Sequence, residues 1–167
     1  DINWYSSVGR EKYYATETFA KDGKLVTEIY AYDKESGEQT VIRSDEVSMA
    51  DRYAPQLLPY EDKMIIGING DVYVYSESGE LLAEADNIYD RDETWYSTDL
   101  KISGDKLYFI VPIKTEDGTS LYDDVYDSEV YSCPIDDLIA GNGERSLEYK
   151  VKNFWSIEAE FGRRVFE

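Results

Sequence analysis

Apolar and polar residues alternate in short runs along most of the chain, a pattern that predicts β-strands rather than helices. The clearest run is Glu28–Ile42, where an acidic residue, an apolar residue and a tyrosine lead through a Ser-Gly turn into a second apolar run. The same order returns at Asp71–Ala85, and its first part returns from Glu129. The chain is therefore predicted to repeat one strand–turn–strand unit. The residues that align between the copies are Ile29, Val72 and Val130; Tyr30, Tyr73 and Tyr131; and Tyr32, Tyr75 and Cys133.

A second pattern lies ahead of each copy and consists of a turn, a basic residue and a run of apolar and aromatic residues. It occurs at Lys12, Lys63 and Lys106, and it returns near the end of the sequence at Arg164. The occurrences lie roughly 40 to 60 residues apart, and short strands repeated at such a spacing are typical of the blades of a β-propeller. We expect the differences in spacing to fall in loops.

Turn signals divide the sequence into four-stranded units. Asp22-Gly23 and Asn69-Gly70 are both two-residue hairpin signals, and Asn-Gly is the strongest of its kind. The expected fold class is all-β, a single partial β-propeller domain of three four-stranded antiparallel blades plus the start of a fourth. Three blades are too few to close a ring, so this is expected to be an open fragment of a larger propeller. The alternative is a three-sheet stack that is stable alone or is completed by another chain. The predicted bounds are blade 1 at residues 1–43, blade 2 at 55–85, blade 3 at 100–151 and the start of blade 4 at 153–167.

Polar and proline-containing stretches predict where the individual strands begin and end. The residues after Arg43 are mostly polar, so we expect a connector there. Proline removes a backbone donor, so Pro112 is expected to end a strand. The expected elements are a strand over Glu38–Arg43, a connector over Ser44–Ala54, a strand over Lys106–Val111, an inserted loop over Lys114–Ser128, a strand over Glu129–Cys133 and one helical turn over Ile135–Ala140.

The two patterns together resemble the blades of bacterial β-propellers. The features that carry the resemblance are runs such as Gly104-Asp105-Lys106-Leu107-Tyr108 and the acidic-apolar-Tyr run with its Ser-Gly-Glu turn. They are similar to TolB-type repeats and to the propeller-like repeats of extracytoplasmic lipoproteins in Gram-positive bacteria. The resemblance implies an extracellular or cell-surface binding module in a bacterium. It assigns no catalytic residue, because the matched positions are strand and turn positions.

A likeness to the aspartate box of sialidase propellers is weaker. Asp90, Thr94 and Trp95 hold three of the places in that box. Ile88 stands where the box has serine, and Asp92 stands where it has glycine, which makes the turn less easily. We therefore set this likeness aside.

The formal net charge of −19 narrows the range of partners. A field of this sign repels phosphate backbones and anionic lipid heads, so neither nucleic acid nor a membrane surface is expected as a partner. The longest apolar runs are too short to span a membrane.

The sequence contains no histidine, which excludes Ser-His-Asp and Cys-His catalysis. Its one cysteine, Cys133, aligns with Tyr32 and Tyr75 and is expected to be a packing residue, a reactive thiol being the alternative.

Candidate chemistry lies in the loops. In a propeller, the loops between second and third strands and the connectors between blades leave the same face, and binding residues concentrate in such loops. The long loops of this chain are rich in acidic and aromatic residues, which suit sugars and cationic groups. The expected ligand-binding residues are Tyr53, Asp90, Arg91, Asp92, Trp95, Tyr96, Tyr122, Asp123 and Asp124.

These loops predict a non-enzymatic, extracytoplasmic binding or interaction module for a carbohydrate, a peptide or a protein. Three alternatives stay open. In the first, Asp86–Asp92 is only a solvated connector. In the second, the loop carboxylates bind calcium, although their spacing is not that of an EF-hand. In the third, the chain is part of a propeller glycoside-active enzyme that uses paired carboxylates. Calcium is the one cofactor considered. Open blade faces also predict self-association, or cover by other chains.

Overall fold

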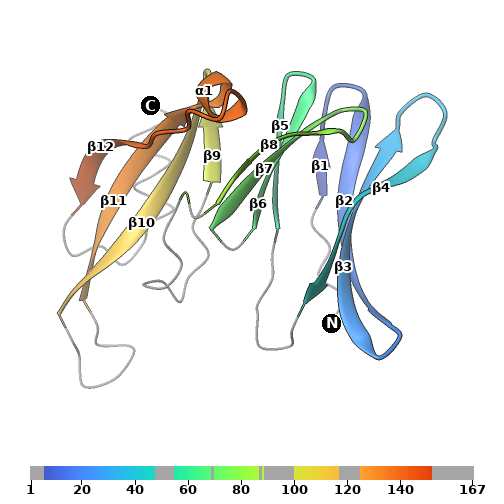
Figure 1. The fold of residues 1–167 in the computed structure, drawn as a ribbon, viewed down its shortest axis with the longest axis horizontal. Coiled ribbons are helices and arrows are strands. Elements are labelled where there is room, and N and C mark those ends of the chain that lie inside the picture. The colour runs from blue at the N-terminus through green and yellow to red at the C-terminus, as the bar shows by residue number, and fades with distance from the viewer. Residues whose placement is uncertain are drawn as a thin grey trace. The chain divides into compact units, whose positions relative to one another are not determined.

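The computed structural model describes residues 6–47, 55–68, 70–86, 88, 100–116 and 125–151. Within these residues the chain forms twelve β-strands and one short helix, arranged as three four-stranded antiparallel sheets (Figure 1). The expected all-β class and the four-stranded antiparallel sheets are thereby confirmed. The chain divides into two compact units, Asp1–Glu84 with the first two sheets and Ala85–Glu167 with the third.

Each sheet is a meander in which strands that follow one another in sequence are paired. Sheet 1 consists of β1 (Ser6–Val8), β2 (Lys12–Lys21), β3 (Lys24–Asp33) and β4 (Gln39–Val47). Sheet 2 consists of β5 (Gln56–Tyr60), β6 (Lys63–Ile68), β7 (Asp71–Ser76) and β8 (Leu81–Ala85). Sheet 3 consists of β9 (Leu100–Ser103), β10 (Lys106–Glu116), β11 (Val125–Pro134) and β12 (Ser146–Val151), with the helix α1 (Ile135–Ile139) between β11 and β12.

The three sheets share one register between their second and third strands. The repeated lysines open the second strands and pair with equivalent residues of the third strands: Lys12 with Asp33, Lys63 with Ser76, and Lys106 with Pro134. One backbone hydrogen bond also joins equivalent turns in every sheet. Its donors and acceptors are Lys34 N and Glu11 O at 3.0 Å, Glu77 N and Asp62 O at 3.0 Å, and Ile135 N and Asp105 O at 2.9 Å. The repeat in the sequence is therefore a repeat of backbone geometry.

The end of β4 differs from the expected limit. The strand continues past Arg43 to Val47, so residues 44–47 are strand rather than connector. The reason is the length of β3, which pairs with β4 as far as Leu25, opposite Val47. A long partner strand satisfies the backbone groups of polar residues, even though their side chains are typical of a loop.

β10 and β11 are also longer than expected. β10 runs through Pro112 to Glu116, and β11 begins at Val125 rather than Glu129, so the loop expected over Lys114–Ser128 is shorter. Pro112 takes part in the ladder with β11, and the expectation that it ends a strand is wrong. Among the described residues, β9 pairs only with the start of β10. No described residue pairs with Pro112 on that side of β10, and a sheet tolerates a residue without an N–H group where the group has no strand partner.

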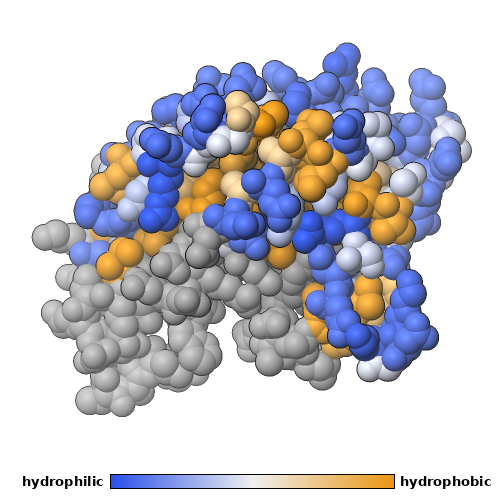
Figure 2. All heavy atoms as spheres, viewed as in Figure 1, coloured by the Kyte–Doolittle hydropathy of each residue, from blue (hydrophilic) through white to orange (hydrophobic). Residues whose placement is uncertain are grey.

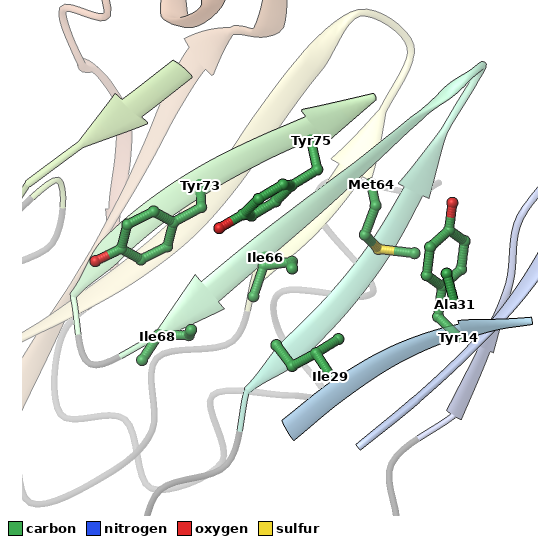
Figure 3. Close-up of a cluster of buried hydrophobic side chains, with 8 residues drawn as sticks. All are labelled: Tyr14, Ile29, Ala31, Met64, Ile66, Ile68, Tyr73 and Tyr75. Carbon is green, nitrogen blue, oxygen red and sulfur yellow. The ribbon is translucent and has the colours of Figure 1, made fainter. Parts of the chain in front are cut away.

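Sheets 1 and 2 pack against each other in the first unit. The opposite face of sheet 2 is buried as well, with Ile65, Val72 and Val74 at 0% exposure. The runs Met64–Ile68 and Val72–Tyr75 have apolar residues at consecutive positions and so place apolar side chains on both faces of sheet 2. The buried residues that form the core between sheets 1 and 2 are drawn in Figure 3: Tyr14, Ile29 and Ala31 from sheet 1, and Met64, Ile66, Ile68, Tyr73 and Tyr75 from sheet 2.

The second unit has its own core on sheet 3. Leu107 and Cys133 are fully buried there, together with Ile135 and Leu138 of α1. The helix confirms the helical turn expected at this place. Cys133 is confirmed as a packing residue, since burial, and after it the charge of Asp137, raises the pKa of its thiol. A protonated, buried thiol is unreactive.

Candidate functional site

The residues expected to bind a ligand lie outside the described part of the chain. The structure does describe the strand ends from which their loops leave, and it describes the side chains at those ends. Their assignment to a binding site stays a prediction. The residues are Tyr53, Asp90, Arg91, Asp92, Trp95, Tyr96, Tyr122, Asp123 and Asp124.

In each sheet, the turn between the second and third strands lies at the same end as the connectors. In sheet 1, the turn after Lys21 lies beside the end of β4, because Leu25 pairs with Val47. In sheet 2, the start of β5 at Gln56 pairs with Gly67, next to the turn between β6 and β7. In sheet 3, β10 and β11 form a long hairpin that extends beyond β9 (Figure 1). We call this end of each sheet its loop end.

The loop end of sheet 1 combines a tight turn with paired charges. Asp22 has φ of 52° and Gly23 has φ of 80°, as a two-residue turn that matches the strand twist requires. The ammonium of Lys24 lies 2.6 Å from a carboxylate oxygen of Glu46, and both side chains are more than half exposed. Such exposed ion pairs add little stability. The ion pair with Lys24 therefore places the Glu46 carboxylate at the loop end but contributes little to stability.

An acidic residue and a tyrosine two positions later form a hydrogen bond on the third strand of every sheet. Side chains two residues apart lie on one face of a strand, so the phenol can reach back to the carboxylate. We call these the acid–tyrosine pairs. Their donor–acceptor distances are 2.8 Å from Tyr30 to Glu28, 3.5 Å from Tyr73 to Asp71, and 2.5 Å from Tyr131 to Glu129.

The surroundings of these tyrosines raise their pKa values. Burial, followed by the hydrogen bond to Glu28, raises the pKa of Tyr30 to about 12. The hydrogen bond to Glu129, followed by burial, raises the pKa of Tyr131. Each phenol therefore stays protonated at neutral pH and acts as a donor to its carboxylate. The sequence shows these positions as a repeat, but their hydrogen bonds become visible only in the structure.

Arg43 connects sheet 1 to an acid–tyrosine pair of sheet 2. Its guanidinium carbon lies 3.8 Å from the centre of the Tyr73 ring, and Nη1 donates a hydrogen bond of 3.3 Å to the Tyr75 hydroxyl. Its Nε lies 2.6 Å from the carboxylate of Asp45, which fixes the side chain. A cation over an aromatic face is attracted by the ring quadrupole. Arg43 therefore links two sheets, a role that strand periodicity does not reveal.

Sheet 3 provides its own cations for the equivalent pair. The guanidinium carbon of Arg145 lies 4.7 Å from the centre of the Tyr131 ring, and Nη1 donates to the carbonyl of Ile88 at 3.1 Å. Lys150 donates a hydrogen bond to the carboxylate of Glu129. This bond, together with the one from Tyr131, lowers the pKa of Glu129. The acid–tyrosine pairs are thus parts of small structural networks.

Ser132 is the described hydroxyl that most resembles a nucleophile beside a carboxylate. Its Oγ donates to Glu148 Oε1 at 2.5 Å, and Lys106 lies 3.4 Å from the same oxygen. The hydrogen bond from Ser132 lowers the pKa of Glu148, which makes this carboxylate a poorer base. Ser132 is also only 1% exposed, so a substrate cannot reach it. The arrangement joins β11 to β12 and serves the structure.

The described acidic side chains and the helix bear on metal binding and on membrane insertion. Among the described residues, no group of three or more histidine, cysteine, aspartate or glutamate side chains is placed to hold a metal ion. Asp86 of the acidic connector is among the described residues, whereas the other carboxylates of that connector, Asp90 and Asp92, lie outside them. No helix in the described part of the chain combines the length and the apolar character needed to cross a membrane.

Comparison with known proteins gives no assignment. No protein-family model matches the sequence, and no match appears among curated proteins. The resemblance to bacterial propeller repeats therefore stays a prediction.

Proposed function

We propose that this chain is a non-enzymatic, extracytoplasmic binding or interaction module whose ligand is held by acidic and aromatic loops at the loop ends of its sheets. The observation that carries the proposal is the shared backbone register, which sends the second-to-third-strand turn and the connectors of each sheet to one end. A rigid set of strands with variable loops at one end is a common arrangement for binding.

The proposed ligand is a carbohydrate, a peptide or a protein with neutral or cationic groups. Aromatic side chains stack on sugar faces and on cations, and the net charge of −19 disfavours anionic ligands. The acid–tyrosine pairs and Ser132 contribute no reactive group to this proposal, because the pKa values of Tyr30, Tyr73 and Tyr131 are raised and Ser132 is buried. The chemistry of binding is assigned to the loops alone.

The proposal also includes the assembly of the sheets as blades of an open propeller fragment. The support is the packing of sheet 1 on sheet 2, in which one face of the repeat, with Ile29, meets the opposite face of the next repeat, with Tyr73. Small-angle X-ray scattering on the purified chain tests this assembly. A profile that fits three stacked sheets agrees with it, whereas a profile of two independent bodies joined by a flexible tether contradicts it.

Ligand binding is tested with glycan and peptide arrays, followed by calorimetry on any hit. Replacing Trp95 and Tyr96 by alanine is expected to weaken binding about tenfold, since one lost aromatic contact is worth roughly 1 kcal/mol or more. Glu35→Gln lies in the turn after β3, at the other end of the sheet, and serves as the control that leaves binding unchanged. Equal effects of both changes, or release of reducing sugar from a bound glycan, would contradict the proposal.

A further inference from the structure

Sheet 1 has one covered face and one open face. Tyr14, Ile29 and Ala31 lie on the face that packs against sheet 2, which we call the inner face. The other face, which we call the outer face, follows from the cross-strand pairs: Val8 with Tyr13, Tyr13 with Tyr32, Ala15 with Tyr30, and Tyr30 with Val41. It exposes Val8, Tyr13 and Val41, which are 63%, 51% and 47% accessible, whereas Tyr30 at its centre is 8% accessible. Figure 2 shows apolar residues reaching the surface among mainly hydrophilic ones.

The repeat gives this outer face a covered counterpart in sheet 2. The shared register places Tyr13 and Tyr32 where sheet 2 has Met64 and Tyr75. It places Ala15 and Tyr30 where sheet 2 has Ile66 and Tyr73. In sheet 2 these positions are buried under the inner face of sheet 1, Met64 and Ile66 being 0% exposed. The outer face of sheet 1 is thus built like a surface that another sheet covers.

The charges on the outer face suit an arginine. In sheet 2, the ring of Tyr73 carries Arg43 of the neighbouring sheet at 3.8 Å. In sheet 1, the equivalent Tyr30 donates its hydroxyl to Glu28, and Glu17 lies opposite Glu28 on the same face. Lys21 lies 3.6 Å from the Glu28 carboxylate and offsets one of these two charges. The face of the Tyr30 ring and the remaining carboxylate charge attract a guanidinium group.

A second copy of this chain is a poor occupant. The inner-face positions that would cover an outer face are already buried in all three sheets, as Ile29 at 0%, Val72 at 0% and Val130 at 2% exposure show. A second folded copy therefore has no equivalent free face among its described residues. The net charge of −19 on each copy adds repulsion.

We propose that the outer face of sheet 1 docks a further four-stranded sheet of the same repeat, from outside these 167 residues, which lays an arginine of its fourth strand on Tyr30 beside Glu28. The occupant presents residues like Tyr14, Ile29 and Ala31 of the inner face of sheet 1. This docking is independent of ligand binding at the loop ends, so either can fail without the other.

The experiment supplies such a sheet by fusing a copy of residues 1–50 ahead of Asp1. The connector between the added sheet and β1 then matches the length of segment 48–55 between β4 and β5. The original sheet carries Val41→Cys, whose thiol reports on the outer face, while Cys133 is buried and reacts slowly. Labelling at the introduced thiol is expected to be at least tenfold slower in the fused chain than in the parent chain with the same substitution.

A matched control removes only the arginine. Arg43→Ala in the added copy is expected to restore most of the fast labelling, whereas Lys24→Ala in the added copy is expected to leave the protection unchanged. Labelling as fast as in the parent, or an added copy that circular dichroism shows to be unstructured, would overturn the proposal.

Sedimentation velocity of the unmodified chain in 1 M salt checks the choice of occupant. A monomer agrees with it, and a dimer that Val41→Glu abolishes would assign the face to a second copy instead.

Discussion

Replacing Arg43 by alanine is predicted to loosen the packing of sheet 1 on sheet 2. The substitution removes a guanidinium that lies over the Tyr73 ring, donates to the Tyr75 hydroxyl and pairs with Asp45. All three contacts are shielded from water in part, since the side chain of Arg43 is 19% exposed and that of Asp45 is 25% exposed. The change leaves the backbone and the apolar core between the sheets in place.

The expected loss of stability follows from these contacts. A cation–π contact is worth about 0.5 to 2 kcal/mol, depending on how far it is desolvated. The hydrogen bond to Tyr75 adds about 0.5 to 1.5 kcal/mol, and the partly exposed pair with Asp45 adds at most about 1 kcal/mol. Contacts of one side chain do not add fully, so Arg43→Ala should cost about 2 to 3 kcal/mol. Arg43→Lys keeps the charge but loses the planar group, and should cost roughly half as much.

The assay is urea unfolding, with amide hydrogen exchange in β6 and β7 to follow the first unit separately from the second. Lys24→Ala is the matched control, because Lys24 forms an ion pair with Glu46 at 2.6 Å on the surface of the same sheet. The control should change the free energy of unfolding by less than about 0.5 kcal/mol. A double-mutant cycle with Tyr73→Leu should give a coupling of about 1 kcal/mol.

The interpretation fails if Arg43→Ala is no more destabilising than Lys24→Ala. It also fails if the cycle with Tyr73→Leu shows no coupling, because the loss of stability would then come from the contact with Asp45 or from packing of the alkyl stem of the arginine. If the alkyl stem is the cause, Arg43→Met, which keeps most of the stem, would be nearly as stable as the unsubstituted chain.

Three other outcomes are expected. Thiol labelling of Cys133 should be slow in the folded chain and fast in denaturant, and fast labelling under native conditions would show that the thiol is accessible. Added salt should raise the melting temperature because it screens the repulsion within a chain of net charge −19, and a much larger rise with calcium than with magnesium at equal concentration would identify a specific calcium site. Hydrogen bonds from Lys150 and Tyr131 lower the folded-state pKa of Glu129, so its contribution to stability is present above the unfolded pKa and is lost as the pH falls through the folded one. Glu129→Gln should therefore reduce the acid sensitivity of unfolding below about pH 5, and an unchanged pH profile would show that the pair contributes nothing.

Much of the fold could be predicted because the repeat fixes its strand starts. The alignment of Lys12, Lys63 and Lys106 locates the second strand of each sheet, and the structure gives all three the same register. Strand ends were harder to predict, as at Pro112, which lies inside β10. A strand continues while its partner continues, whatever the polarity of its side chains. Single-strand patterns therefore place the ends of β4 and β10 too early and the start of β11 too late.

The candidate site also has a part that the sequence predicts and a part that it does not. Aligned tyrosines such as Tyr30 and Tyr73 are visible in the sequence, since they recur at fixed positions. The contact of Arg43 with Tyr73 joins residues of two sheets, and no local spacing encodes it. Composition suggests a loop site, because acids and aromatics gather between the strands. Its geometry depends on long loops, whose conformations follow from contacts that sequence periodicity does not contain.

The acid–tyrosine pairs show which part of the repeat is fixed and which part varies. Every sheet has the carboxylate, the tyrosine and the register that brings them together, but the cation over the tyrosine ring comes from a different place in sheet 2 and in sheet 3. Tyr73 takes it from the neighbouring sheet through Arg43, whereas Tyr131 takes it from its own sheet through Arg145. A repeat with a constant scaffold and a variable cation can adjust its sheet-to-sheet contacts without changing its strands. Differences between the sheets in how they pack then arise from the cations, while the strands keep one register.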